Sequence, residues 1–593
     1  MLAPDARAIL LDQLRPPFGY RLDAAVATTF TLDLAAALVP PLAFAAFELR
    51  STPDPVAALE AVRSCADRVD VFCQAGQITV PAHASDLMAF LEPMIHQVDR
   101  PRPGHLFHPK IWLLRYTSDD DRPQHRLLCL TRNLTRDHSW DTVVRLDGNT
   151  TGGPKAANRP LAELIRSLPG RAVTPLPEGR RQRITALADE VRRVVWEHPD
   201  DVTEINLHVF GVRGIRPTAD FSGYRHLVVA PFLNDRGLDT VARDSPDASV
   251  VSRIDDLNRL APAAAARITS YVVSAIAGLG EPTGADDPAD QQILAGLHAK
   301  LYVVERNRRA HVFIGSANAT DAAFGGNVEI LVELVGGATK LGVDTFLGPE
   351  APFRTLLEEY DTAGGADPDP ADEAQRALED LVRDLAAIPY TATVTSDGDN
   401  HRVRVTTDRP LPIPAGYDVT AELLTRPGEA RVLVANVPAG AEYPGVSLAD
   451  VTPFVVLRVR SPEGLQRGTV VHATLVDDPT GRLDEILARQ VDNSEKFLRF
   501  LALLLGLADP NLLLSGTGQG DGVGITRITV GPGVFELVLR ALAGRPEALV
   551  DLDGLVRRLQ ATDAGRRVLP EGFDVLWPTV LEAHRRLEEV TVG

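Results

Sequence analysis

Two short stretches combine residue types that could act together on a phosphate ester. His108-Pro109-Lys110 and His298-Ala299-Lys300 each place a histidine two residues before a lysine. A neutral imidazole can attack phosphorus, and a protonated imidazole can donate a proton to a leaving oxygen. Lysine supplies a compact positive charge for the non-bridging oxygens. Two facing histidines could therefore divide the roles of nucleophile and acid.

Each pair is followed by a turn that ends in asparagine. These turns are Thr131-Arg132-Asn133 and Gly315-Ser316-Ala317-Asn318. Asparagine adds a neutral donor without changing the charge, and a Gly-Ser turn can bring the backbone close to an oxyanion. We predict a catalytic set of six residues, supported by three turn residues. The six are His108, Lys110, Asn133, His298, Lys300 and Asn318, and the supporting residues are Thr131, Gly315 and Ser316.

The surroundings of both pairs are typical of β-strands. Ile111-Trp112-Leu113-Leu114 and Leu301-Tyr302-Val303-Val304 are rich in β-branched and aromatic residues. Residues two apart on a strand point to the same face, so each histidine shares a face with its lysine. Only five of the 61 lysine and arginine residues are lysine, and two of those five stand in these pairs. A single pair would be an ordinary strand, but the repetition favours a functional site.

The repeated pattern resembles the phospholipase D superfamily, whose signature is H-x-K and a G-S-x-N turn, twice per active site. The second copy is similar throughout, and Glu329 stands where the family often has a glutamate, so we add it to the supporting residues. Glu305 replaces the aspartate of the lipase form. The first copy, with Thr131-Arg132-Asn133, looks more like tyrosyl-DNA phosphodiesterases and bacterial nucleases. The resemblance covers roughly residues 25 to 345.

That resemblance implies a phosphodiesterase that needs no metal or cofactor. One histidine becomes a phosphohistidine, and the other protonates the leaving oxygen and then activates water. In the tyrosyl-DNA group the first-copy histidine attacks, which favours His108, although the sequence leaves the choice open. Arginines near the first copy, among them Arg115, Arg132 and Arg136, are candidates for DNA binding. A solvated arginine surface explains them equally well.

Composition sets further bounds. A chain of 593 residues suggests three or four domains, and its 45% hydrophobic and 24% charged residues are typical of soluble proteins. A net charge of -19 argues against broad polyanion binding but leaves room for a local basic groove. Three cysteines in apolar surroundings suggest buried, inert thiols in a reducing compartment. With no leader-like N-terminal pattern, we expect a cytoplasmic protein.

Alternating strands and helices predict an α/β fold: a duplicated phospholipase D-like α/β sandwich with mixed sheets, then an all-β module and a helical C-terminal domain. The expected parts are repeat 1 (1–150), a helical connection (151–200), repeat 2 (201–360), a linker and helix (361–388), a β-rich accessory module (389–480) and the helical domain (481–593). Individual helices are predicted over Asp54–Ala66, Ala82–Val98, Glu178–Glu197 and Ser494–Leu507, and a mobile loop over Ser515–Gly524.

We therefore expect a metal-independent DNA nuclease, with DNA preferred over RNA. The extra modules suggest bacterial anti-phage defence or DNA repair, with a helicase or ATPase as a candidate partner protein. A lipid phosphodiesterase or phosphatidyl transferase is the first alternative, but it would need a membrane-seeking surface, and no basic amphipathic helix is evident. The second alternative is an inactive scaffold that binds nucleic acid. The oligomeric state stays open.

Overall fold

The computed structural model describes most of the chain up to Gln490 and parts of the remainder. The described residues are 10–45, 63, 65–119, 122–136, 139–243, 245–274, 296–367, 369–490, 497, 552–553, 556–557, 559–560, 563–570 and 573–592. Three predicted segments lie outside this set apart from a few positions: the helix over Asp54–Ala66, the apolar helix over Ser494–Leu507 and the loop over Ser515–Gly524.

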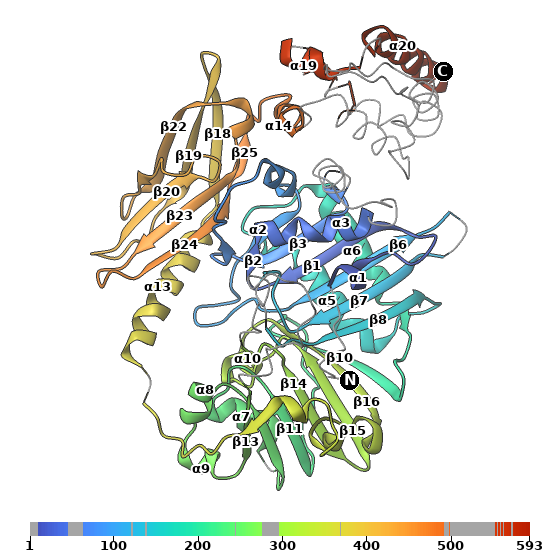
Figure 1. Cartoon of the computed structure of the whole chain (residues 1–593), viewed down its shortest axis with the longest axis vertical. Helices are drawn as coiled ribbons and strands as arrows, with labels where there is room; N and C mark the ends of the chain where they lie inside the picture. Colours follow the sequence, from blue (N-terminus) through green and yellow to red (C-terminus); the bar gives the residue numbers. More distant parts are fainter. Residues whose placement is uncertain are drawn as a thin grey trace, which may run out of the picture.

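A mixed sheet built from apolar, β-branched strands forms the first part of the molecule (Figure 1). Its strands are β1 Arg21–Thr29, β3 Val69–Gln74, β5 Ile95–Val98, β6 Ile111–Thr117, β7 Gln124–Leu130, β8 Val143–Thr150 and β9 Val194–Trp196. They lie in the order β5-β3-β1-β6-β7-β8-β9. β1, β3 and β5 run parallel, whereas the remaining pairs are antiparallel.

Short helices and a small strand pair accompany this sheet. They are α1 Leu10–Leu14, β2 Leu32–Asp33, α2 Leu34–Ala37, α3 Val39–Ala45, β4 Ile78–Thr79, η1 Asp86–Leu91, η2 Ala156–Asn158, α5 Arg159–Ser167, η3 Pro169–Arg171 and α6 Glu178–Val191. The single helix predicted over Ala82–Val98 is wrong, because this segment forms η1 and strand β5. The helix predicted over Glu178–Glu197 ends at Val191, and β9 follows it.

A second mixed sheet follows. Its strands are β10 Val202–Phe210, β11 Arg225–Val229, β12 Ala248–Val251, β13 Thr269–Val273, β14 Leu301–Arg306, β15 Arg309–Gly315, β16 Glu329–Gly337 and β17 Leu357–Glu359. Its helices are α7 Asp235–Ala242, α8 Ile254–Asn258, α9 Pro262–Ala265, α10 Asp321–Gly325, α11 Ala338–Leu341, α12 Val343–Leu347 and η6 Arg354–Leu356. The strand order is β10-β16-β15-β14-β11-β12-β13-β17.

The two sheets repeat one arrangement. The order β5-β3-β1-β6-β7-β8 in the first corresponds to β13-β12-β11-β14-β15-β16 in the second. Both have a parallel run of strands followed by an antiparallel one. These sheets confirm the predicted α/β fold with mixed sheets, and their common topology makes β6 the counterpart of β14 and β7 the counterpart of β15.

The two sheets also share a core. One buried apolar cluster combines Leu127 and Val144 of the first sheet with Val209, Ile330 and Val332 of the second. The two sheets therefore pack directly against each other, and burial of their shared apolar surface holds them together. The ends of strands from both sheets can therefore contribute to one site.

An all-β module follows the second sheet. Helix α13 Pro370–Ala386 leads into two four-stranded sheets, ordered β22-β19-β18-β25 and β21-β20-β23-β24. The strands are β18 Tyr390–Asp397, β19 Asn400–Pro410, β20 Asp418–Leu423, β21 Arg431–Val432, β22 Pro438–Val446, β23 Phe454–Arg460, β24 Gln466–His472 and β25 Thr474–Val476, with η7 Leu448–Asp450 between β22 and β23. This module was predicted from the alternating pattern.

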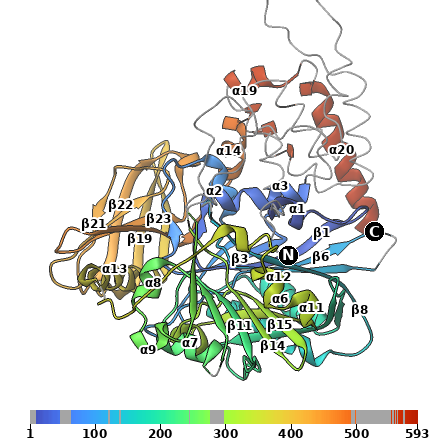
Figure 2. The same cartoon turned by 60° about the horizontal axis from the view of Figure 1, so that its bottom comes forward.

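The module is docked on the β5 side of the first sheet. Gln97 donates to Val470 O at 3.2 Å and accepts from the backbone N–H of His472 at 2.7 Å. The described C-terminal helices are α14 Arg482–Gln490, α19 Asp563–Val568 and α20 Phe573–Val592. Figure 2 shows α19 and α20 on the side of the first sheet that faces away from the second sheet. The described elements of the C-terminal part are helices, which agrees with the predicted fold class.

Candidate active site

The first histidine motif crosses from one repeat to the other. Phe107 forms a parallel β-bridge with Val328. The backbone N–H of His108 donates to Val328 O at 2.9 Å, and the N–H of Val328 donates to Leu106 O at 2.8 Å. Because His108 follows Phe107 and Glu329 follows Val328, this bridge sets the imidazole of one repeat beside the carboxylate of the other.

The second histidine motif makes the equivalent crossing in the other direction, from the second repeat to the first. Leu297 forms a parallel bridge with Trp140 of the first repeat. The N–H of His298 donates to Trp140 O at 2.7 Å, and the N–H of Trp140 donates to Gly296 O at 3.0 Å. In this register Asp141 takes the place beside His298 that Glu329 takes beside His108. Two pseudo-symmetric bridges therefore join the motif copies.

Three side chains contact the carboxylate of Glu329 at the first crossing. The Glu329 side chain is fully buried. The imidazole Nδ1 of His108 lies 3.0 Å from Oε2, and Ser316 Oγ donates to the same oxygen at 2.5 Å. Asn327 Nδ2 donates to Oε1 at 3.1 Å. A carboxylate that accepts several hydrogen bonds is fixed in place, and it fixes the ring that donates to it.

The electrostatics favour an ionised Glu329 beside a neutral His108. Burial alone would raise the pKa of Glu329, but the adjoining His108, together with Lys110 and Ser316, holds that pKa below its ordinary value. Burial is the main cause that lowers the pKa of His108 to about 4, and Lys110 and Lys300 add to the effect. At neutral pH the ring then donates from Nδ1 and keeps a lone pair on Nε2.

The two lysines are buried in matching positions. Lys110 Nζ donates to His108 O at 2.9 Å, and Lys300 Nζ donates to His298 O at 2.9 Å. Lys300 also reaches across to Thr131 O at 3.4 Å. Burial lowers the pKa of Lys300 to about 7 and lowers that of Lys110 well below its usual range, with the charge of Lys300 contributing to the latter. Charged groups from both motif copies therefore influence one another.

The turns after the two motifs are also equivalent. Thr131 exchanges hydrogen bonds with Thr142, and Ser316 does so with Ile330. Gly315 allows this approach, because a Cβ atom on it would lie 2.1 Å from Ile330 O. Thr131 and Ser316 thus bind each turn to the strand that follows it.

The asparagines that end these turns occupy equivalent positions in the two repeats, and Asn133 lines a pocket together with Lys110. Asn133 accepts from the backbone N–H of Thr31 at 3.3 Å, which leaves its amide Nδ2 for another partner. Asn318 carries a buried amide oxygen that has no hydrogen-bond partner among the described residues. Buried polar atoms are usually paired, so this amide is a candidate to bind a ligand.

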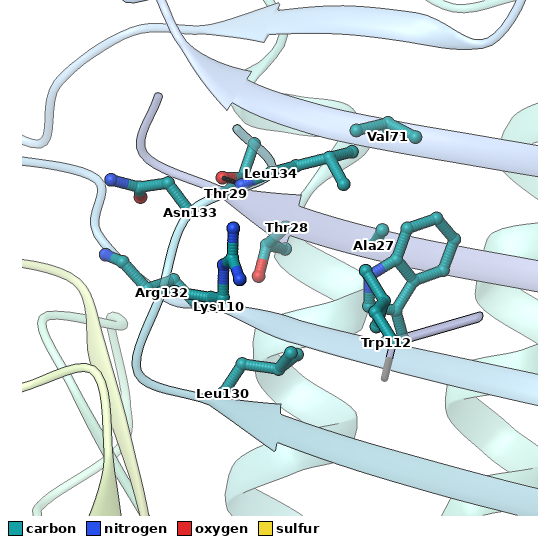
Figure 3. A pocket seen from close by; sticks show the side chains of 11 residues that line it. Ala27, Thr28, Thr29, Val71, Lys110, Trp112, Leu130, Arg132, Asn133 and Leu134 are labelled. Carbon is teal, nitrogen blue, oxygen red and sulfur yellow. Dashed lines mark hydrogen bonds between the residues drawn. The ribbon is translucent and has the colours of Figure 1, made fainter. Parts of the chain in front are cut away.

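A pocket lies beside the first motif (Figure 3). Lys110, Arg132 and Asn133 gather at one end of it, and Trp112 and Ala27 lie at the other. The ring of Phe30 packs edge-on against His108, with ring centroids 5.2 Å apart, and Lys110 Nζ lies 5.8 Å from its centroid. The polar end of the pocket is therefore bordered by an aromatic ring.

The three predicted DNA-binding arginines have different positions. Arg132 lines the pocket, and its Nε lies 3.4 Å from Asp141. Arg136 is exposed on the loop that follows. Arg115 is not brought to the site, because it lies further along β6 and forms ion pairs with Asp23 and Glu190.

Sequence reasoning missed two residues of this region. Asp141 gave no motif signal, although its place after Trp140 becomes clear once the two bridges are compared. Arg253 was also missed. Its Nη2 donates to Leu297 O at 3.4 Å, and it packs over the ring of Phe232. Since it stands 45 positions before His298 in the numbering, spacing alone could not have found it.

The described residues lack two kinds of feature. None of their helices is both long enough and apolar enough to cross a membrane. Among the same residues, no group of three or more His, Cys, Asp and Glu side chains has an arrangement that could hold a metal ion. Glu305, at the position of the lipase-form aspartate, is buried and accepts from the backbone N–H of Val343 at 2.7 Å. This contact gives Glu305 a structural role.

No family model matches this sequence, and no curated protein matches it. Similar solved structures include polyphosphate kinase from Porphyromonas gingivalis, with 14% identity and a TM-score of 0.29 over 55% of this chain and 44% of that chain. This chain thus spans less than half of that kinase. Yeast tyrosyl-DNA phosphodiesterase has 11% identity and a TM-score of 0.33 over 56% and 87% of the respective chains. Phosphatidylserine synthase from Haemophilus influenzae Rd KW20 has 12% identity and a TM-score of 0.33 over 64% and 90%. At TM-scores this low, the similarities assign no function, which must come from the site itself.

Proposed function

We propose that this protein is a phosphodiesterase that cleaves DNA through a phosphohistidine on His108 and needs no metal ion. The observation that carries this proposal is the contact of His108 Nδ1 with the buried carboxylate of Glu329 at 3.0 Å. It fixes the tautomer whose Nε2 can attack phosphorus. Lys110 and Lys300, one from each motif copy, supply amine donors for the non-bridging oxygens of a phosphodiester.

In the first step, the Nε2 lone pair of His108 forms a bond to phosphorus. The bond from phosphorus to the leaving oxygen breaks, and that oxygen takes the proton from Nε2–H of His298, which acts as general acid. The Nδ1–H of His108 stays with Glu329 and balances the charge that develops on the ring. Lys110, Lys300, Asn133 and Asn318 bind the non-bridging oxygens.

In the second step, water releases the phosphoryl group. The now neutral His298 takes a proton from water, and the resulting hydroxide oxygen bonds to phosphorus while the bond to His108 breaks. His108 returns to its starting tautomer, and His298 is again protonated. Every proton and bond is accounted for with groups of this chain and one water molecule.

His108 is the better nucleophile of the two histidines for a physical reason. Its ring is held by an ionised carboxylate and stays neutral at neutral pH, since burial lowers its pKa to about 4. A nucleophile needs a free lone pair, whereas an acid needs a proton. Both requirements are met if His298 carries the proton and His108 does not.

DNA is the proposed substrate because the site presents aromatic and arginine side chains beside its phosphate-binding residues. Phe30 adjoins His108 and Lys110, and Arg132 lines the same pocket. Aromatic rings and arginine are the usual groups that bind single-stranded nucleic acid. We further propose a cytoplasmic role in anti-phage defence or DNA repair with a helicase or ATPase partner, as the extra modules suggest.

The test uses purified protein in EDTA with single-stranded DNA, duplex DNA, RNA and phosphatidylcholine vesicles. The proposal expects DNA cleavage that persists in EDTA and is lost in His108→Ala and in His298→Ala. Turnover of phosphatidylcholine without DNA cleavage would contradict it. So would DNA binding without any cleavage, which would mark an inactive scaffold.

A further inference from the structure

Arg253 and Phe232 lie at the edge of the second sheet from which the second histidine motif starts. Val229, the last residue of β11, pairs with Val251 at the end of β12 and with Leu301 at the start of β14. Phe232 and Arg253 follow these two strand ends, whereas His298 and Lys300 precede β14. The strand register alone therefore collects all four residues at one edge.

The side-chain contacts agree with this placement. The guanidinium carbon of Arg253 lies 4.4 Å from the ring centroid of Phe232. Its Nη2 donates to Leu297 O, next to His298, at 3.4 Å. Burial lowers the pKa of Lys300, and the charge of Arg253 lowers it further. Arg253 thus adds a positive charge to the rim of the site.

Among the described residues, one atom accepts a hydrogen bond from this guanidinium. Arginine has five N–H donors in a planar fork. Within the described part of the chain, the contact to Leu297 O is the single hydrogen bond of the Arg253 guanidinium, and no carboxylate lies within ion-pair distance of it. Phe232, which fixes the plane of the guanidinium, is 42% exposed. The fork is therefore held in place with donors available for an anion.

At the equivalent position of the first repeat the side chain is neutral. By the strand register, Gln74 is the counterpart of Arg253, because Thr28 pairs with both Phe72 and Ile111 as Val229 pairs with Val251 and Leu301. Gln74 is buried and accepts from the backbone N–H of Phe107 at 2.8 Å. Support of the motif backbone is thus possible with a neutral, buried side chain, and the charge of Arg253 goes beyond it.

We propose that Arg253 binds the phosphate next to the scissile phosphate of a polynucleotide, with Phe232 holding its guanidinium in the binding orientation. This inference rests on the proposed function and deepens it, because it makes a chain with consecutive phosphates the preferred substrate. Lys110, Lys300 and the two motif asparagines already provide donors for the scissile phosphate. Arg253, which contacts the residue before His298, is suited to the neighbouring phosphate. Its planar guanidinium can bind two phosphate oxygens in a bidentate manner.

The test compares two substrates in EDTA. One is a short single-stranded oligodeoxynucleotide, and the other is thymidine 5′-(p-nitrophenyl) phosphate, which has a single phosphodiester. In Arg253→Gln, kcat/KM for the oligonucleotide should fall about tenfold or more beyond any fall for the single ester, mainly through KM. Arg253→Lys should recover part of the loss. Arg309→Gln is the matched control, because Arg309 begins β15 at the end away from the motif turn.

A binding measurement separates this inference from the proposed function. Fluorescence anisotropy with a labelled oligonucleotide is recorded in the His108→Ala background, with and without Arg253→Gln, over a range of salt concentrations. Loss of one phosphate contact should weaken binding and reduce the salt slope by about one unit. An unchanged slope, or equal losses on both substrates in the kinetic assay, would overturn the inference. If the wild-type protein turned over neither substrate, the proposed function would be overturned instead. The salt dependence of oligonucleotide binding would still decide the role of Arg253.

Discussion

At the scale of single residues, the decisive contact is between a ring and a carboxylate from different repeats. Glu329 accepts from Nδ1 of His108, and the same carboxylate is held by Ser316 and Asn327. Such a carboxylate orients the imidazole and selects its tautomer. Reactivity at His108 should therefore depend on a residue that never touches the substrate.

Replacing Glu329 by glutamine tests this dependence. An amide can donate to Nδ1 of His108 and so favour the tautomer that carries its proton on Nε2, which cannot attack. We expect kcat on DNA to fall by about 10³-fold or more, by analogy with the loss of the carboxylate in a catalytic triad. The measurement is kcat in EDTA, with circular dichroism to verify folding. A correctly folded variant with kcat within tenfold of wild type would contradict the role given to Glu329.

The pH dependence tests the lysines. Burial lowers the pKa of Lys300 to about 7, so its positive charge is present below that pH and is lost as the pH rises through it. His108 must be neutral to attack. Because its pKa is about 4, kcat/KM should fall as the pH drops through that value. We expect kcat/KM to decline above about pH 7. In Lys300→Arg the decline should become shallower, because guanidinium stays charged, while the general acid His298 must still keep its proton. A wild-type profile with no basic limb would refute this reading of Lys300.

The residue types at the site could be predicted from the sequence, but their partners could not. Histidine, lysine and asparagine were found because the same spacing occurs twice. The contact of His108 with Glu329 spans 221 positions, and no local pattern encodes it. Arg115 shows the opposite error. It is near the motif in sequence, yet β6 carries it away from the site into ion pairs with Asp23 and Glu190.

At the scale of elements, the turns after β7 and β15 set the distance between strand ends and the motif residues. Gly315 N lies 3.4 Å from Lys300 O, and Leu130 N lies 2.9 Å from Lys110 O in the equivalent place. In the second turn Gly315 packs directly against the backbone of Ile330. This close approach explains why glycine stands there.

Gly315→Ala should therefore be costly. The added Cβ would lie 2.1 Å from Ile330 O, so β15 and β16 must separate. We expect a loss of about 1–3 kcal/mol in the free energy of unfolding, as for other overpacked sites, together with reduced activity. Urea denaturation measures it. Gly152→Ala is the control, because a Cβ there would meet nothing within 4 Å. Equal stabilities of the two variants would contradict the account of this turn.

The segment Ala82–Val98 shows why some elements escaped prediction. Leu87, Phe90, Leu91 and Ile95 have helical spacing, which favoured one long helix. In the structure the 3-10 helix ends at Leu91, and Ile95 pairs in parallel with Val71. Sheet pairing overrides local spacing here, because the extra strand buries its backbone groups in the ladder. By contrast, the accessory module was predictable, since alternating strands bounded by glycine and proline have a strong local signature.

At the scale of the whole molecule, one buried charge cluster joins three parts of the chain. Arg482 of α14 donates to Glu92, next to η1 of the first repeat, at 2.7 Å, and to Asp478 at 2.7 Å. It also donates to Val451 O of the accessory module at 3.1 Å. The side chain of Arg482 is only 4% exposed. This cluster ties the first repeat, the module and the C-terminal helices together.

Breaking this cluster on one side should destabilise the junction. Arg482→Met leaves Glu92 buried without its charged partner, and such a loss costs about 3–5 kcal/mol. Adding Glu92→Leu should restore much of the stability, because the uncompensated charge is removed. Urea unfolding followed by circular dichroism measures both. Arg489→Gln removes an exposed pair with Asp450 and should have little effect. If the single Arg482 variant were as stable as this control, the cluster would not hold the junction.

The most direct test of the central claim is the location of the covalent phosphoryl group. In His298→Ala, thymidine 5′-(p-nitrophenyl) phosphate should still react once, because nitrophenolate leaves without a proton donor, and the adduct should persist because no base activates water. Mass spectrometry under alkaline conditions should then find the thymidylyl group on His108, and none in His108→Ala. An adduct on His298 of the wild-type protein, or substrate turnover that survives His108→Ala, would contradict the account.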